Sequence, residues 1–343
     1  MTAPDDRAER HVRQVRLPQV GAAGQARLAA AHVAIVGVGA TGSHLAETLG
    51  RAGVGRLTLI DRDVVELSNL QRQTLFTDDD ARQLRPKAVA AAAALAAIDP
   101  GLRLTAEVAD ITADNAAALL GDADLVLDGT DNFPTRFLLN DWCVRAGRPF
   151  IYTGAVGTEG QSLVIVPGAP CLRCYVPDPP PPGSLPTCDT AGVLASAVAL
   201  VCALSATEAL KLLLGRSDEV RAGEVAVIDA WSGDVRHLKL RREPDCPCCV
   251  QGRFPFLDEA PAALATVLCG RDAVQLPAEG PPADLAALAG AWAREGEVRS
   301  SPFMVRLDTP ERRVLVFADG RMIVGGTADP AVARSVRARL LGS

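Results

Sequence analysis

Residues 31–53 read AHVAIVGVGATGSHLAETLGRAG, and this stretch decides the fold of the chain. Its β-branched apolar run predicts a buried strand, its glycines a turn, and the residues from Ser43 onward a helix. Residues 37–42, GVGATG, fit the pattern G-x-G-x-x-G. Glycines at such a turn let the backbone approach phosphate, and the following helix N-terminus offers N–H donors. The stretch therefore predicts a nucleotide-binding loop.

The sequence around this loop continues the alternation of strands and helices. Asp61 ends the next strand, 56–61, and lies 19 residues after Gly42, where an acid can bind ribose hydroxyls. We expect further strands at 102–108, 123–132, 149–156 and 161–166, and helices at 87–98, 115–120 and from Phe133. This order predicts an α/β fold, a Rossmann-like, doubly wound and mostly parallel sheet. Taken alone, the glycine loop favours an NAD-dependent oxidoreductase.

The segment after Asp61 argues against that alternative. It places Asp63, Asn69, Arg72, Gln73 and Lys87 within one stretch, DRDVVELSNLQRQTLFTDDDARQLRPKA. A nicotinamide pocket does not need several cations, whereas a triphosphate whose charge grows during transfer does. The segment therefore predicts an ATP site.

Composition limits the class of protein further. The chain has 343 residues, a net charge of −6 and 4% aromatic residues, which argue against nucleic acid as a partner. The charged N-terminus has no apolar core segment, and the apolar stretch 191–206 is short for a membrane span. We therefore expect a cytoplasmic protein with a buried helix at 191–214.

We expect two domains, an ATP-binding domain at 1–250 and a small α+β domain at 251–343. The first should end with a hairpin of strands 224–230 and 234–240, and the second should contain a hairpin around Asp319-Gly320 and a helix from Pro330.

Nine cysteines are read here in a reducing compartment, where pairs favour metal or catalysis over disulfides. Two C-x-x-C pairs, Cys171/Cys174 and Cys246/Cys249, are separated by 71 residues. Four thiolates suit a closed, tetrahedral, structural Zn²⁺ site, and the alternative is a reduced set of thiols without metal. The run CPCC also allows Cys248 as the fourth ligand, but the spacing of the first pair favours Cys249.

Cys188 stands apart from these pairs. It follows the proline-rich segment 177–186, which cannot join a sheet, and it precedes the helix expected from residue 191, whose dipole would lower the pKa of the thiol. Position alone leaves a nucleophile and an inert cysteine equally open. Cys143 and Cys202 lie in apolar helical patterns and are predicted to be core residues.

Five motifs occur in one order along the chain: DRDVVELSNLQRQ, DGTDNFPTR, CLRC, TCDTAGV and PDCPCC. Together they resemble the ThiF/MoeB family of adenylyltransferases, bacterial relatives of the ubiquitin-activating enzymes, over about residues 8–250. The resemblance implies ATP-dependent adenylation of the C-terminal glycine carboxylate of a small ubiquitin-like sulfur carrier protein ending in Gly-Gly. Pyrophosphate would be released, and sulfur from a donor such as a cysteine desulfurase or a rhodanese would then give the thiocarboxylate used in thiamine, molybdopterin or tRNA thiolation.

The resemblance also assigns roles to individual residues. Asp61 would hold the ribose, Asn69, Arg72 and Lys87 the phosphates, and Asp131 a Mg²⁺ ion. Arg13 would reach the ATP of a partner subunit in a homodimer, and Cys188 would bond covalently to the activated carrier. The implied catalytic set is Arg13, Arg72, Lys87, Asp131 and Cys188, and the implied nucleotide-binding set is Gly37, Gly39, Ala40, Gly42, Asp61, Asn69, Arg72, Gln73, Lys87, Asp131 and Asn132.

Two features qualify the resemblance. Ala40 replaces a glycine that is common in the family loop, and the stretch between Arg72 and Lys87 is longer than in relatives. The alternative outside the enzymes is an inactive scaffold that is stabilised by zinc and binds the carrier. The intact Asp61 and Asp131 argue against it. Cys269 invites comparison with a rhodanese loop, but the Gly and Ser expected after its arginine are missing.

Overall fold

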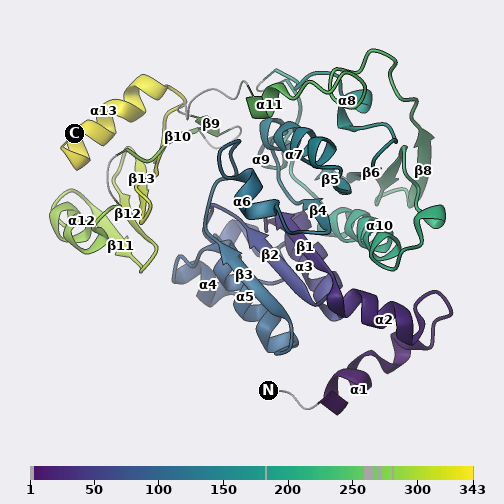
Figure 1. Cartoon of the computed structure of the whole chain (residues 1–343). Helices are drawn as coiled ribbons and strands as arrows, with labels where there is room; N and C mark the ends of the chain where they lie inside the picture. Colours follow the sequence, from purple (N-terminus) through teal and green to yellow (C-terminus); the bar gives the residue numbers. More distant parts are fainter. Residues whose placement is uncertain (1–3, 182–183, 259–265, 269–271, 280–281, 343) are drawn as a thin grey trace. The chain divides into compact units, whose positions relative to one another are not determined.

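The computed structural model describes residues 4–181, 184–258, 266–268, 272–279 and 282–342. This part of the chain divides into two compact units. The first comprises residues 1–81, 86–180 and 191–260, and the second comprises 82–85, 181–190 and 261–343. Each unit has its own sheet (Figure 1). The buried apolar residues form two clusters in the first unit and one in the second.

The first unit is built on an eight-stranded sheet with the strand order β3-β2-β1-β4-β5-β6-β7-β8. Strands β1 to β5 run parallel, and β6, β7 and β8 continue the sheet antiparallel. The predicted mixed, mostly parallel α/β fold is therefore confirmed. Up to residue 258 the elements are α1 (Pro4–Val15), α2 (Gly21–Ala30), β1 (His32–Val36), α3 (Ala40–Arg51), β2 (Arg56–Ile60), η1 (Leu67–Asn69), α4 (Asp78–Arg82), α5 (Lys87–Ile98), β3 (Arg103–Glu107), α6 (Ala116–Leu120), β4 (Leu125–Asp128), α7 (Phe133–Ala146), β5 (Phe150–Val156), β6 (Glu159–Ile165), α8 (Leu172–Tyr175), α9 (Cys188–Ala191), α10 (Ala195–Leu213), η2 (Ser217–Glu219), β7 (Glu224–Asp229), β8 (Asp234–Lys239) and α11 (Pro255–Asp258).

Helices cover both faces of this sheet because its strands are apolar on both sides. Val33 and Ile35 of β1 pack in one core with α3, α5 and α10, whereas Ala34 and Val36 pack in a second core with α6 and α7. Fully buried strands of this kind are expected in a parallel sheet covered on both faces. The β7–β8 hairpin forms as predicted, although every residue of β8 is exposed at the edge of the sheet.

Helix α10 lies in the core of the first unit. Within the described chain it is the one helix long and apolar enough to cross a membrane by length and composition. It packs against α3, β5 and β6, and Val198, Val201 and Cys202 are buried there. The predicted core helix is thus present, but its predicted start at residue 191 is wrong. Gly192 has a φ of +74°, which breaks the chain between the single turn α9 and α10.

The second unit contains a six-stranded sheet of order β11-β12-β13-β14-β10-β9, in which every pairing is antiparallel. The hairpin around Gly320 and the helix from Pro330 form as predicted, which gives a small α+β unit. Trp292 and Val336, from the two helices, pack on Val305 and Val316 of the sheet. The elements are β9 (Thr266–Leu268), β10 (Ala273–Leu276), α12 (Leu285–Trp292), β11 (Glu297–Ser300), β12 (Met304–Asp308), β13 (Arg313–Phe317), β14 (Met322–Gly325) and α13 (Pro330–Leu341).

The turn between β1 and α3 has no room for a side chain at Gly42. A Cβ there would lie 1.9 Å from the carbonyl oxygen of Gly37, whereas one at Gly39 would meet only Gln73 Nε2, at 3.6 Å. Alanine stabilises a helix by up to about 1 kcal/mol relative to glycine. The backbone displacement that a Cβ at position 42 would force costs more than this. We expect Gly42→Ala to lower the free energy of unfolding by about 3 kcal/mol. Gly290→Ala, a control at a helical glycine where an added Cβ meets nothing within 4 Å, should change it by less than about 1 kcal/mol, as measured by urea denaturation. Equal effects of the two substitutions would contradict this account of the turn.

Candidate nucleotide site and cysteine cluster

The predicted nucleotide residues converge on one edge of the first sheet. The chain runs outward from β1 through β2 to β3 and then returns to place β4 on the other side of β1. Ligands of open α/β sheets bind outside the carboxyl ends of the strands at such a reversal. Three loops follow strands at this edge, and they contain Gly37, Asp61 and Asp131.

The glycine loop is packed backbone against backbone with the loop after β4. Gly37 has a φ of +81°, and a Cβ on it would lie 2.7 Å from the backbone of Gly129. A Cβ on Gly129 would in turn lie 2.0 Å from the carbonyl oxygen of Gly37. Gly129 was missed in the sequence analysis because its role depends on β4 lying beside β1. The space beside Gly39 stays open, and Ala40 begins α3.

Asp61 is buried beside the glycine loop. Its Oδ2 accepts a hydrogen bond from the Val38 amide at 2.6 Å, and its Oδ1 accepts one from the Asp63 amide at 2.7 Å. Burial raises the pKa of this carboxyl, against the lowering effect of the Lys87 ammonium. A carboxylate has about four acceptor positions, so Asp61 retains capacity for ribose hydroxyls.

The segment after Asp61 brings polar atoms to the same region without satisfying all of them. The Asn69 side chain caps η1 through the Glu66 amide at 3.2 Å, and Arg72 donates to the Ser68 carbonyl at 3.0 Å. Arg72 Nε and Gln73 Oε1 are buried with no hydrogen-bond partner in the part of the chain that the structure describes. Buried polar atoms are costly without partners, so these two atoms fit a site that is completed by a polar ligand.

The loop after β4 is held by a buried ion pair. Arg136 Nε donates to Asp128 Oδ2 at 3.0 Å, and its Nη2 donates to the Thr130 carbonyl at 2.6 Å. The guanidinium also lies over the rings of Phe133 and Tyr152, at 5.3 and 5.0 Å. Arg136 was not singled out from the sequence, yet it fixes the backbone on which Asp131 stands.

The far end of this loop leaves Asp131 exposed. Asn132 is the N-cap of α7, where its side chain accepts from the Thr135 amide at 3.0 Å. An exposed carboxylate beside a nucleotide loop fits Mg²⁺, which keeps several waters and needs one or two carboxylates. Asp128 is fully buried, which agrees with its interpretation as a structural residue at the end of the strand.

Two predicted catalytic residues lie on other parts of the chain. Arg13 is exposed on α1, and its neighbour Arg10 donates to the Ile98 carbonyl at 2.7 Å. Cys188 belongs to the second unit, where it begins α9. Because α10 starts only at Ala195, the dipole of a long helix does not act on Cys188 as the sequence analysis assumed. Cys269 lies outside the described residues.

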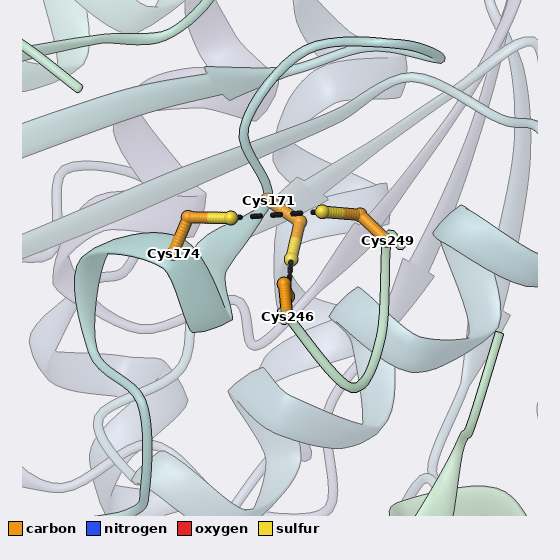
Figure 2. Close-up of side chains that lie close together, drawn as sticks. All are labelled: Cys171, Cys174, Cys246 and Cys249. Carbon is orange, nitrogen blue, oxygen red and sulfur yellow. Dashed lines mark hydrogen bonds between the residues drawn. The ribbon is translucent and has the colours of Figure 1, made fainter. Parts of the chain in front are cut away.

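Four cysteines form a cluster that can hold a metal ion. The Sγ atoms of Cys171, Cys174, Cys246 and Cys249 all lie within 4.8 Å of one another. Cys174 comes from α8 and Cys171 from its N-cap, and they face the loop after β8, with 3.6 Å between the sulfur atoms of each opposed pair (Figure 2). Zn–S bonds of about 2.3 Å in a tetrahedron place sulfur atoms about 3.8 Å apart. The cluster fits Zn²⁺.

The fifth thiol of this region lies outside the cluster. Cys248 Sγ accepts a hydrogen bond from Asn140 Nδ2 at 3.3 Å, while Asn140 Oδ1 accepts from the Leu172 amide at 2.9 Å. The choice of Cys249 over Cys248 as a ligand is therefore supported by the geometry. Cys143 and Cys202 are buried, as predicted, and burial raises the pKa of both thiols.

Three of the four cluster thiols are poorly suited to remain as free thiolates, whereas a hydrogen bond from Arg242 lowers the pKa of Cys249. Burial raises the pKa of Cys174 and, to about 11, that of Cys246. A hydrogen bond that the Cys171 thiol donates to Cys248, together with burial, raises the pKa of Cys171. Four anions this close repel one another, and a bound cation reverses this by stabilising every thiolate.

The fold and these two sites define a nucleotide-binding α/β protein with a structural cysteine cluster. The model of the ThiF family matches residues 11–248. A sulfur carrier protein ThiS adenylyltransferase of Bacillus subtilis (strain 168) is 40% identical over 339 residues, 97% of this chain and 99% of the relative. The chain belongs to the ThiF family, and the resemblance seen in its motifs is confirmed.

Other matches cover the chain less completely. A sulfur carrier protein adenylyltransferase of Thermus thermophilus is 43% identical over 247 residues, which is 70% of this chain and 90% of the relative. The 247 aligned residues are too few to include both units of this chain in full. The crystal structure of E. coli MccB with MccA-N7isoASN superposes with a TM-score of 0.62 at 23% identity, over 73% of this chain and 75% of that one. This likeness shows the fold alone.

The cluster predicts different outcomes for two adjacent cysteines. Cys249→Ser removes one of four ligands, so we expect the purified protein to lose most of its zinc and to unfold at a lower temperature. Cys248→Ser changes a buried neighbour that is not a ligand and should retain one zinc per chain. Zinc would be measured by mass spectrometry of the metal, with thermal denaturation alongside. Loss of zinc from Cys248→Ser but not from Cys249→Ser would reverse the assignment.

Proposed function

We propose that this protein is an ATP-dependent adenylyltransferase that activates the C-terminal glycine carboxylate of a small ubiquitin-like sulfur carrier protein. The observation that carries the proposal is the sheet edge at the β1–β4 reversal, with its close-packed glycines and the buried polar atoms of Arg72 and Gln73 that have no partner among the described residues. The names of the B. subtilis and T. thermophilus relatives support the choice of a sulfur carrier as substrate.

The residues at this edge of the sheet suit the negative charge that builds up in this reaction. A carboxylate oxygen of the carrier attacks the α-phosphorus of ATP, and the bond from that phosphorus to the oxygen bridging to the β-phosphate breaks. Pyrophosphate leaves with the electron pair. Because two anions meet, cations must lie at the phosphates. Arg72 and Lys87 would take this role, the glycine-loop amides would bind phosphate oxygens, and Asp61 would orient the ribose.

Mg²⁺ at Asp131 would neutralise charge on the phosphates when bound. Arg136 would contribute indirectly, because it fixes the backbone from Asp128 to Thr130 and so the position of Asp131. The cysteine cluster would hold Zn²⁺ as a structural ion. It would tie the segment after β6 to the loop after β8, and it would take no part in the chemistry.

We assign further features to this function as proposals. Arg13, exposed on α1, would reach the nucleotide of a second copy in a homodimer. Cys188 would attack the carbonyl carbon of the acyl-adenylate through its thiolate, releasing AMP with the electrons of the broken C–O bond and leaving a thioester. Sulfur transfer from a separate donor would follow, and the reaction would take place in the cytoplasm. Residues 1–250 would form the adenylation domain.

Exchange of labelled pyrophosphate into ATP tests the first step. We expect exchange only when a carrier ending in Gly-Gly is present, with Asp131→Asn reducing it at least about 100-fold because the phosphates lose their metal ion. Asp114→Asn, at an exposed acid of the same unit, is the matched control and should keep full exchange. No exchange with any carrier, together with tight binding of NADH, would support the oxidoreductase instead.

The same assay separates the covalent step from adenylation. Cys188→Ala should keep carrier-dependent exchange within about twofold, because the thiol acts only after pyrophosphate has left. The same variant should lose the covalent adduct between protein and carrier that non-reducing electrophoresis detects. Loss of exchange in a folded Cys188→Ala protein would place Cys188 in the first step and contradict this assignment.

A further inference from the structure

The side chain of Asn140 lies between the two halves of the cysteine cluster. Its Oδ1 accepts a hydrogen bond from the Leu172 amide at 2.9 Å, and its Nδ2 donates to Cys248 Sγ at 3.3 Å. Leu172 lies within the first C-x-x-C pair, and Cys248 lies within the CPCC run that contains the second pair. One side chain of α7 therefore contacts both halves of the cluster. Asn140 was not singled out from the sequence.

The partners of this amide determine its orientation. The Leu172 amide can only donate, so the oxygen of Asn140 must face it and the nitrogen must face Cys248. Nδ2 also donates to Asp141 Oδ1, at 3.4 Å. Asn140 is fully buried, and a buried amide is tolerated when its oxygen and its nitrogen both have partners. These contacts make Asn140 a polar bridge inside the core.

Cys248 extends this bridge to a ligand of the cluster. The Cys171 thiol is hydrogen-bonded to Cys248, which is itself buried. Asn140 thus reaches the cluster by two routes, through the backbone of α8 and through the sulfur of Cys248. Groups that hydrogen-bond around metal ligands orient them and set the metal affinity. Asn140 and Cys248 occupy such positions around the Zn²⁺ ion that the four cysteines fit.

The helix that carries Asn140 also carries the residue that holds the nucleotide loop. Arg136 precedes Asn140 by four residues on α7, and residues at this spacing lie on one face of a helix. Arg136 is hydrogen-bonded to Asp128 and to the Thr130 carbonyl. One face of α7 is therefore fixed to the loop after β4 and, one turn later, to the cysteine cluster.

The packing of α7 leaves it little freedom between these two contacts. Phe137, Leu139 and Cys143 are fully buried. Protein interiors packed at this density have low compressibility and transmit strain. A displacement of α7 at the cluster would therefore reach its N-cap, Asn132, and the adjacent Asp131.

We propose that Asn140 is a positioning residue through which the metal-loaded cluster fixes α7 and the loop that bears Asp131. Zn²⁺ would join the two halves of the cluster and so hold both partners of Asn140 in place. This inference rests on the proposed function, in which Asp131 serves the nucleotide, and on the fit of Zn²⁺ to the cluster. Zinc binding and ATP binding should then strengthen each other, because such coupling is reciprocal.

The first test measures zinc affinity in Asn140→Leu, which removes the hydrogen bonds with little change in volume. We expect the affinity to fall about 10- to 100-fold, as measured by competition with a chromogenic zinc chelator in the absence of ATP. Ser205→Ala is the matched control, because Ser205 is buried in the same unit and hydrogen-bonds to Thr153 and Ser162 instead. It should keep zinc affinity within about twofold. Unchanged zinc affinity in Asn140→Leu would overturn the proposal.

The second test measures the Kd for ATP by calorimetry on zinc-saturated protein. It should rise at least about fivefold in Asn140→Leu, the lower end of usual coupling between sites, and stay within about twofold in Ser205→Ala. A purely local role of Asn140 would lower zinc affinity and leave ATP binding unchanged, and that result would overturn the proposal. Thermal denaturation of each variant checks that folded proteins are compared.

The wild-type protein offers a test that does not depend on the folding of any variant. Saturating ATP with Mg²⁺ should slow the transfer of zinc to a chelator of negligible Mg²⁺ affinity at least about fivefold. ATP binding without any effect on zinc transfer would overturn this inference alone, as would equal slowing in Asn140→Leu. Failure of the zinc-loaded wild type to bind ATP would overturn the proposed function and the inference with it.

Discussion

The close approach of two backbone turns is the constraint on which the rest of the site depends. Gly37 and Gly42 meet Gly129 at distances that no Cβ could occupy, so the loops after β1 and β4 are locked together at the reversal of strand order. This contact brings the backbone amides at the N-terminus of α3 to the same edge as the loop that bears Asp131. Phosphate binding requires both the amides and the approach.

Two buried cations are held by carboxylates at this edge. Arg136 is committed to the fold, because it is buried against Asp128 and the Thr130 carbonyl. Lys87 lies 3.4 Å from Asp63, and its charge also acts on Asp61. A site organised before substrate arrives spends little energy on rearrangement at the moment of reaction. The cysteine cluster contributes by fixing the antiparallel half of the sheet.

Sequence reasoning succeeds here where a signal is local or strictly spaced. The strand–glycine–helix pattern predicted the sheet, and the two C-x-x-C pairs predicted the cluster, including Cys249 over its neighbour Cys248. It fails where tertiary contact decides. Gly129 matters only because β4 lies beside β1. The start of α10 was missed because one residue, Gly192, takes a positive φ.

The central claim is that the protein transfers an adenylyl group to a carrier carboxylate at the β1–β4 edge of the sheet. Incubating the protein with a Gly-Gly carrier and ATP labelled either at the α- or at the γ-phosphate, followed by intact-mass analysis of the carrier, tests it most directly. The account predicts a carrier that has gained one adenylyl group and carries the α-label, with labelled pyrophosphate from the γ-position. A carrier that carries the γ-label, with ADP as the product, would contradict it.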